Sequence, residues 1–218
     1  VWTGEFPIWE TTTSIGNHAF YCCASLTGSV KIPDTFTSVG NSAFWGCTGI
    51  TEVIIPDGVE TIELGVFYNC SGIKKVTLPI SCEYCLVSYP AFAGCNSVEE
   101  IIYTVGNGTV FEAGSGQSLP AYARSSLVKV SYEEGITALP ESTLYQCSNL
   151  TEVQLPSTLT MVSDSAFYQC IKLKTMTFIG NAPSFGSNCF YKVVAEVFYN
   201  PNTQGWTEDV RQNYGGTI

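Results

Sequence analysis

Basic residues are scarce in this sequence of 218 residues. It has nine lysines and arginines against 19 aspartates and glutamates, which gives a formal net charge of −10. Proteins that bind nucleic acid or an anionic membrane surface use clustered Lys and Arg to neutralise phosphate and lipid charges. We therefore expect neither a nucleic-acid partner nor insertion into a membrane. No apolar run approaches the roughly 20 residues that span a bilayer.

Histidine is almost absent, and this excludes most catalytic plans. A Ser-His-Asp or Cys-His arrangement would depend on His18, the single histidine. His18 lies in Gly-Asn-His-Ala-Phe, and the sequence Gly-Asn-Ser-Ala-Phe recurs one repeat later, so position 18 is a variable position of a repeat. No glycine-rich phosphate loop is present either. We expect no enzyme activity, no cofactor and no metal.

A repeat of about 23 residues runs through nearly the whole chain. Its pattern is Phe-x-x-Cys-x-x-Leu-x-x-Val-x-Leu-Pro, and the central apolar residue recurs at intervals of 23, 23, 25, 29, 23, 23 and 21 residues. The eight central positions are Val30, Val53, Val76, Ile101, Val130, Val153, Met176 and Val197. This spacing predicts about eight stacked turns, because one unit cannot bury its apolar side chains alone.

Each repeat unit predicts the same local structure. The Leu-x-x-Val-x-Leu stretch alternates between apolar and polar residues, which indicates a short strand with one face in the core. The proline that follows, as at Pro56, cannot donate to a strand ladder and ends the pairing. The Ala-Phe-x-x-Cys segment predicts a helical or 3-10 turn with the Phe inward. Strands that meet after a full turn are parallel.

These features predict a leucine-rich-repeat solenoid. We expect a β-rich fold of the α/β class with one parallel sheet, helical or 3-10 turns on the opposite side and right-handed winding. Residues 1–199 form the solenoid, with a partial N-terminal turn at 1–14. Residues 200–218 depart from the pattern and are expected to be a C-terminal cap of the same domain.

The sequence resembles the BspA-type leucine-rich-repeat family of bacterial surface and secreted proteins. The Ala-Phe-x-x-Cys-x-x-Leu-x-x-Val-x-Leu-Pro units carry this resemblance, and so does the tail with Phe178-Ile-Gly-Asn-Ala-Pro and Val197-Phe-Tyr-Asn-Pro. The resemblance implies an extracellular or cell-surface adhesion module whose partner is a protein or cell-surface ligand, such as a host matrix protein. It supplies no binding residues. The alternative is a structural spacer that displays other domains, and we expect a monomer.

The cysteines are best explained as apolar core residues. Six of the ten hold one register position, namely Cys23, Cys47, Cys70, Cys95, Cys147 and Cys170. Equivalent side chains on stacked turns point the same way, which disfavours disulfides between them. Cys82 and Cys85 replace apolar residues that follow Pro79, although a disulfide involving Cys82, Cys85 or Cys22 remains open. Zinc would need a second pair of ligands.

The outward strand positions form the candidate binding face. In the row before the central residue, charges of opposite sign alternate, which indicates either a stabilising ladder or a polar ligand strip. The next row adds apolar Ile54, Ile102 and Phe198, which we expect to be exposed. The candidate residues are Glu52, Ile54, Lys75, Thr77, Glu100, Ile102, Lys129, Ser131, Glu152 and Gln154. The loop over residues 106–118, in the 29-residue interval, is a second candidate contact region.

Overall fold

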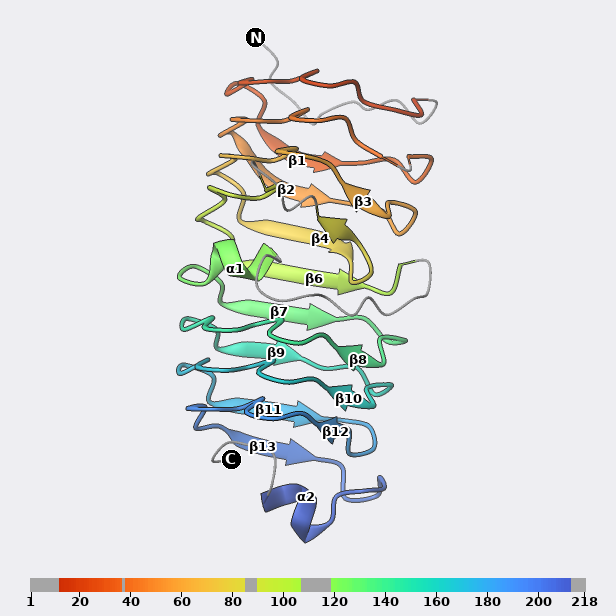
Figure 1. The fold of residues 1–218 in the computed structure, drawn as a ribbon, viewed down its shortest axis with the longest axis vertical. Helices are drawn as coiled ribbons and strands as arrows, with labels where there is room; N and C mark the ends of the chain where they lie inside the picture. Colours follow the sequence, from red (N-terminus) through yellow and green to blue (C-terminus); the bar gives the residue numbers. More distant parts are fainter. Residues whose placement is uncertain (1–11, 37, 85–89, 107–118, 213–218) are drawn as a thin grey trace. The chain divides into compact units, whose positions relative to one another are not determined.

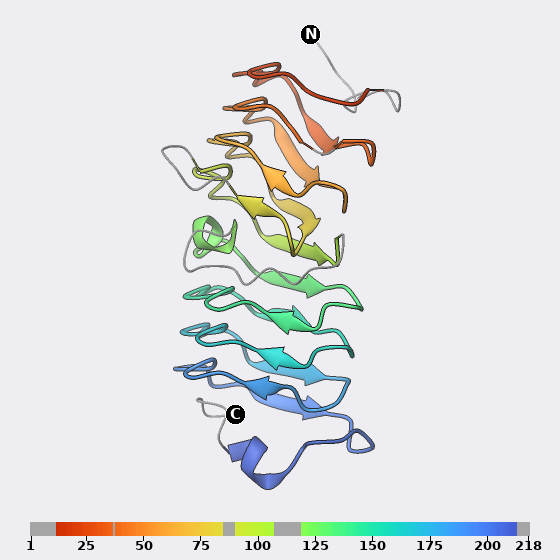
Figure 2. The same ribbon diagram turned by 45° about the vertical axis from the view of Figure 1, so that its right-hand side comes forward.

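The computed structural model describes residues 12–36, 38–84, 90–106 and 119–212. The chain divides into two compact units, Val1–Thr109 and Val110–Ile218. Each unit is a parallel β-solenoid in which short strands lie above one another and tight turns lie on the far side of the core (Figures 1 and 2). The predicted fold class is confirmed in both.

The main sheet of the first unit contains four described strands in sequence order. They are β1 (Gly28–Lys31), β2 (Ile50–Ile54), β4 (Lys75–Pro79) and β6 (Glu100–Thr104). All pairs are parallel, and Val76 pairs with Val53 on one side and Ile101 on the other. A smaller sheet joins β3 (Thr61–Ile62) to β5 (Glu83–Tyr84). An isolated parallel bridge between Ile15 and Val39 adds an earlier turn.

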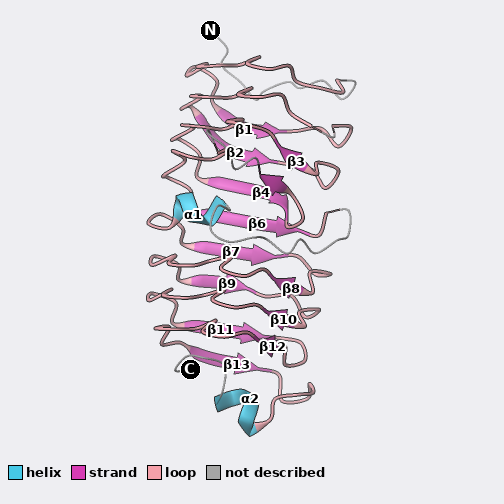
Figure 3. Cartoon of the chain, in the orientation of Figure 1, coloured by secondary structure: helices cyan, strands magenta, loops and turns pink. Residues whose placement is uncertain are grey.

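The second unit repeats this plan. The described strands of its main sheet are β7 (Lys129–Tyr132), β9 (Glu152–Gln154), β11 (Thr175–Phe178) and β13 (Glu196–Tyr199). A second sheet contains β8 (Ala138–Leu139), β10 (Met161–Val162) and β12 (Ser184–Phe185). The helices of the described residues are short, α1 (Leu119–Ala123) and α2 (Glu208–Gln212) (Figure 3).

The strand register predicted from the repeat is confirmed. All eight central residues lie in the main-sheet strands of the described chain, and all except Val197 are buried. Eight strands enclose seven intervals, so the chain has about seven full turns where the sequence predicted about eight. Three complete intervals lie in each unit, and the seventh is the 29-residue interval from Ile101 to Val130.

The side opposite the sheet differs from the prediction. Apart from α1, the Ala-Phe-x-x-Cys segments form consecutive tight turns and not helices. His18 and Cys22 both have φ of 57°, in the left-handed region, and pairs of positive-φ residues four apart recur in later turns. A continuous helix needs right-handed residues throughout, so these positions interrupt it.

The same turns bond to their neighbours in an alternating way. The amide of Ala19 donates within its own turn to the carbonyl of Gly16 at 3.3 Å, whereas the next amide, that of Phe20, donates to the carbonyl of Ala43 one turn away at 2.8 Å. The pattern repeats at Ala43 and Phe44. The turn side is therefore held to the next turn by backbone hydrogen bonds, as the sheet is, which a helix would not allow.

Stacked phenylalanines fill the core behind these turns. The rings of Phe44 and Phe67 lie 5.4 Å apart and those of Phe67 and Phe92 5.2 Å apart, nearly parallel in both cases. In the second unit the rings of Phe167 and Phe190 are 5.2 Å apart. All five side chains are buried. One inward ring in each turn thus produces a continuous apolar row within the unit.

The thiols of the buried register cysteines donate hydrogen bonds to the preceding turn. The thiol of Cys70 donates to the carbonyl of Phe44, one turn earlier, at 2.9 Å, and the thiol of Cys95 donates to the carbonyl of Phe67 at 3.1 Å. Cys170 does the same toward Leu144 at 3.1 Å. Each of these carbonyls also accepts the backbone amide of the register cysteine in its own turn, as Phe44 does from Cys47 at 3.1 Å, so the thiol is a second donor to it. Cys23, in the first described turn, is only partly buried.

Nine of the ten cysteines lie among the described residues, including Cys22 and Cys82, and no disulfide joins any two of them. Cys82 is buried, as predicted for an apolar substitute. Cys85 lies outside the described residues.

The C-terminal segment packs against the last strands of the second unit. The indole of Trp206 stacks on Tyr199 with ring centres 4.9 Å apart and lies 5.2 Å from the ring of Phe178. Its Nε1 donates to the carbonyl of Gly180 at 3.3 Å. The cap over residues 200–218 stays a prediction, and residues 213–218 lie outside the described residues.

Thiol reactivity tests the buried cysteine row. Burial raises the pKa of Cys47 to about 11 and that of Cys70 to about 12. At pH 8 both stay protonated, and a protonated thiol is a poor nucleophile. Titration with an aromatic disulfide reagent should therefore modify exposed Cys22 rapidly and leave the buried row unmodified until denaturant is added. The variant Cys22→Ser should remove the rapid phase; rapid modification of all ten thiols in native protein would contradict the packing.

Candidate binding face

The outward residues nearest the start of each strand form an ion-paired ladder. In the first unit Lys75 Nζ lies 3.3 Å from a carboxylate oxygen of Glu52 and 3.8 Å from one of Glu100. In the second unit Lys129 Nζ lies 3.1 Å from Glu152. The directly opposite positions are paired residues of neighbouring parallel strands. The alternation of sign predicted from the sequence is confirmed, and opposite charges face each other on neighbouring strands.

The second outward row is less exposed than predicted. Ile54 and Ile102 are half-buried, because outward side chains on strands about 4.8 Å apart cover one another. Thr77 lies between them, paired with both. In the second unit Ser131 Oγ donates to Gln154 Oε1 at 3.0 Å, and Phe198 is 49% exposed, as expected.

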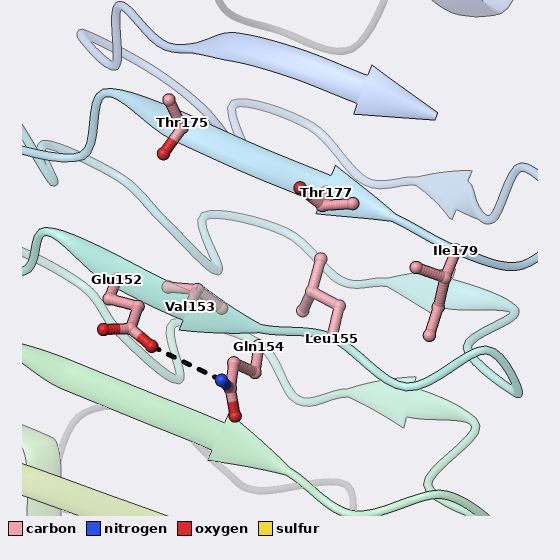
Figure 4. A pocket seen from close by; sticks show the side chains of 7 residues that line it. All are labelled: Glu152, Val153, Gln154, Leu155, Thr175, Thr177 and Ile179. Atoms are coloured by element: carbon pink, nitrogen blue, oxygen red, sulfur yellow. Dashed lines mark hydrogen bonds between the residues drawn. The ribbon is translucent and has the colours of Figure 1, made fainter. Parts of the chain in front are cut away.

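A groove crosses the sheet face of the second unit (Figure 4). It has a volume of about 420 Å³, and its lining residues are Glu152, Val153, Gln154, Leu155, Thr175, Thr177 and Ile179. Thr175 and Thr177 are the two outward residues of β11, and their side chains are short. The longer Glu152 and Gln154 of β9 are directed toward β7, where they contact Lys129 and Ser131, so the hollow lies over the short side chains of β11 (Figure 4).

The groove has chemically different ends. Glu152, paired with Lys129, supplies a carboxylate near the start of the strands, and Gln154 Nε2 donates to its Oε1 at 3.4 Å. Leu155 and Ile179 lie near the ends of the strands, and Ile179 is 49% exposed. The groove can therefore receive a polar or cationic group at one end and an apolar group at the other.

The groove includes only part of the predicted face. Glu152 and Gln154 line it, and Lys129 and Ser131 support those two side chains. The other predicted residues, Glu52, Ile54, Lys75, Thr77, Glu100 and Ile102, lie on the sheet of the first unit. The sequence analysis missed Thr175, Thr177 and Ile179. The sequence does contain an indication of the groove, because β11 has a small polar residue at both of its outward positions.

The turn face carries a pattern that the sequence analysis did not find. The residue after the inward Phe, or after Leu144 in its place, is aromatic in several turns, and these rings stack. Trp45 and Tyr68 lie 4.0 Å apart in the first unit; in the second, Tyr168 lies 4.8 Å from Tyr145 and 4.7 Å from Tyr191. Since the rings cover one another's faces, their first role is to stabilise the stack.

The described residues offer little for catalysis or metal binding. His18 is exposed and lies beside the ring of Tyr21. No group of three or more His, Cys, Asp or Glu side chains in the described ranges could hold a metal ion. No helix of the described chain is long and apolar enough to cross a membrane. Of the loop over residues 106–118, predicted as a contact region, residues 107–118 lie outside these ranges.

Comparison with known families agrees with the repeat. The model of the BspA type leucine rich repeat region matches residues 4–114 and 117–201, in six copies. The chain belongs to the BspA-type leucine-rich-repeat family. No curated protein matches the sequence.

Three solved bacterial structures match the chain. The BspA-type chain is 21% identical to a leucine-rich repeat protein from Eubacterium ventriosum, with a TM-score of 0.57, and the match covers 87% of this chain and 47% of that one. A leucine rich repeat protein of T. pallidum is 27% identical, with a TM-score of 0.48 over 74% of this chain and 71% of that one. A leucine rich cell surface protein from Faecalibacterium prausnitzii is 24% identical, with a TM-score of 0.41, over 93% and 46%. The chain spans just under half the length of the first and last of these.

Reversing one charge tests the ladder of this BspA-type chain. The substitution Lys75→Glu removes two ion pairs and places three glutamates side by side. We expect the free energy of unfolding to fall by about 1 kcal/mol at low salt. The loss should shrink in 1 M NaCl, where the screening length is about 3 Å.

The control is Lys75→Gln, which removes the attraction without adding repulsion and should cost less than Lys75→Glu. Chemical denaturation at both salt concentrations measures the differences. Equal stability of Lys75→Glu and the unmodified protein at low salt would show that the ladder does not stabilise the sheet.

Proposed function

We propose that this chain is a non-catalytic binding module of a bacterial cell-surface or secreted protein. It binds a protein or cell-surface ligand, such as a host matrix protein, through the sheet face, with the groove on β9 and β11 as the central contact. The observation that carries the proposal is the groove itself, which combines an ion-paired carboxylate, two short hydroxyl side chains and an exposed apolar end.

The rigidity of the face supports recognition. Glu152 is held by Lys129, and Gln154 is held by Ser131 and Glu152. The backbone beneath belongs to a sheet paired on both sides of β9 and β11. A ligand therefore meets side chains that are already ordered and loses less conformational entropy on binding.

The lining of the groove also supports a non-catalytic role. Glu152 is its single titratable side chain. Glycoside hydrolysis, for example, needs two carboxyl groups. A groove with one ion-paired carboxylate is suited to recognition of a cationic or hydrogen-bonding group.

The proposed cell-surface or extracellular location is inferred from the family to which the chain belongs. The resemblance is to bacterial surface and secreted proteins, and the excess of acidic over basic residues is consistent with a protein partner and not with nucleic acid. A repeat module can also act as a spacer, and the experiment below separates the two roles.

Filling the groove tests the proposal. The variant Thr177→Arg places a long cation at the bottom of the hollow, next to Gln154 and Glu152. The control Thr137→Arg makes the same change at an exposed threonine that precedes β8, away from the groove lining. Binding to immobilised fibronectin, fibrinogen, laminin and collagen, and to whole epithelial cells, would be measured by surface plasmon resonance and flow cytometry.

We expect at least one of these ligands to bind, Thr177→Arg to weaken that binding at least tenfold, and Thr137→Arg to change it less than twofold. Circular dichroism would confirm that both variants fold. Equal weakening by the two variants would place the contact elsewhere, and absence of binding to every ligand would favour the spacer role.

A further inference from the structure

A second patch of the second unit combines lysines with exposed apolar side chains. It lies on the turn side and at the corner that leads into the sheet, in the last two turns. We call it the lysine patch, and its residues are Ile171, Lys172, Lys174, Tyr191, Lys192 and Val194. None of them lines the groove.

Stacking of the two turns brings the apolar members into register. Phe167 and Phe190 stack with ring centres 5.2 Å apart and are 23 residues apart in sequence, so Ile171 and Val194 occupy the same position on neighbouring turns. Their side chains are large and unusually exposed, at 52% for Ile171 and 63% for Val194. Tyr191, at the end of the tyrosine stack, is 40% exposed.

The fold does not require apolar residues at this position. It directly follows the register cysteine, and in five other turns it is small or polar, at Ala24, Thr48, Ser71, Asn96 and Ser148. The position after the stacked aromatic residue likewise carries Gln146 and Gln169 in the preceding turns and a lysine only at Lys192. In the last two turns, apolar and cationic residues therefore stand at positions that are small or polar in the other turns. Stacking of the turns does not require them there.

The charge of the patch is opposite to that of the chain. Three of the nine basic residues lie here, in a protein with a net charge of −10. Lys172, Lys174 and Lys192 are all exposed. Lys172 Nζ donates to Asn149 Oδ1 at 2.6 Å, and Lys192 Nζ lies 5.5 Å from the ring centre of Tyr191. Glu196, two residues after Val194, is the acidic residue nearest in sequence, so the lysines are in excess.

We propose that the lysine patch binds an acidic, apolar segment of a partner protein. Exposed aromatic and aliphatic side chains supply the buried centre of such a contact, and the lysines at its edge pair with carboxylates of the partner. A short segment meets only this patch. An anionic membrane is an extended surface, and it would also face the excess negative charge of the rest of the chain, which opposes binding. The proposal stands independently of the sheet-face groove.

The test uses a fluorescein-labelled peptide of twelve residues in which Asp and Glu alternate with Leu and Phe. A poly-glutamate peptide of equal charge, and vesicles containing 30% phosphatidylserine, serve as comparison probes. Fluorescence anisotropy measures the peptides, and co-sedimentation measures the vesicles. Amide chemical-shift mapping of the ¹⁵N-labelled protein locates the contact.

Two variants divide the patch into its components. The pair Lys172→Glu with Lys192→Glu reverses charge, and the pair Ile171→Ser with Val194→Ser restores the small polar type found at Ser148. The matched control is Lys31→Glu with Lys74→Glu, which changes net charge equally on the first unit. We expect each patch variant to weaken binding of the mixed peptide at least tenfold and the control less than twofold, with shifts confined to residues 171–174 and 191–194.

Several results would overturn the proposal. Equal weakening by the control would mean that only net charge matters, and poly-glutamate binding as tight as the mixed peptide would remove the apolar contribution. Tighter binding to the vesicles than to the peptide would identify a lipid surface as the partner. Absence of saturable peptide binding would mean that the patch has no such partner. Loss of peptide binding in Thr177→Arg would instead assign the contact to the groove.

Discussion

The structure depends on hydrogen bonding between equivalent positions of successive turns. A parallel ladder joins the strands, with Val76 opposite Val53 and Ile101, and a second set of bonds joins the tight turns, where Phe20 donates to Ala43. Since both sides of each turn bond to the next, equivalent side chains must lie above one another. The phenylalanine, cysteine and tyrosine rows and the alternating charges all follow from this constraint.

In a stack, each side chain contacts the side chains at the same repeat position in the turns before and after it. This limits which residues can occupy a given position. A buried row must accept identical neighbours, which stacked rings and thiols do: Cys70 donates to the carbonyl of Phe44 and needs nothing from Cys47 or Cys95. A charged row cannot repeat one sign, so Lys75 alternates with Glu52 and Glu100. Positions that are neither in a buried row nor in the charged row, such as Ile171 and Thr177, can carry residues selected for function.

The sequence predicts the strands well because their spacing is nearly constant and the pattern has period two. It predicts the turn side poorly. Ala-Phe-x-x-Cys reads as a helical turn by its apolar spacing, but alternate amides bond to the neighbouring turn and require left-handed residues such as Cys22 and Gln169. The groove was not predicted because it arises from the short side chains of Thr175 and Thr177. The pattern of charges along the strands indicates only the longer residues beside them. Exposure of Ile54 was overestimated because strand neighbours cover it.

Deleting one turn from the second unit tests the register most directly. Removing Val153–Thr175, which is 23 residues, joins Glu152 to Met176 and keeps the inward and outward positions of the strand. Removing Val153–Met176, one residue more, places Thr177 inward and Phe178 outward, because side chains alternate along a strand. The account predicts that the first deletion folds cooperatively, with circular dichroism like that of the intact chain and a modest fall in melting temperature, and that the second melts far lower or does not fold. Equal melting temperatures of the two deletions would contradict it.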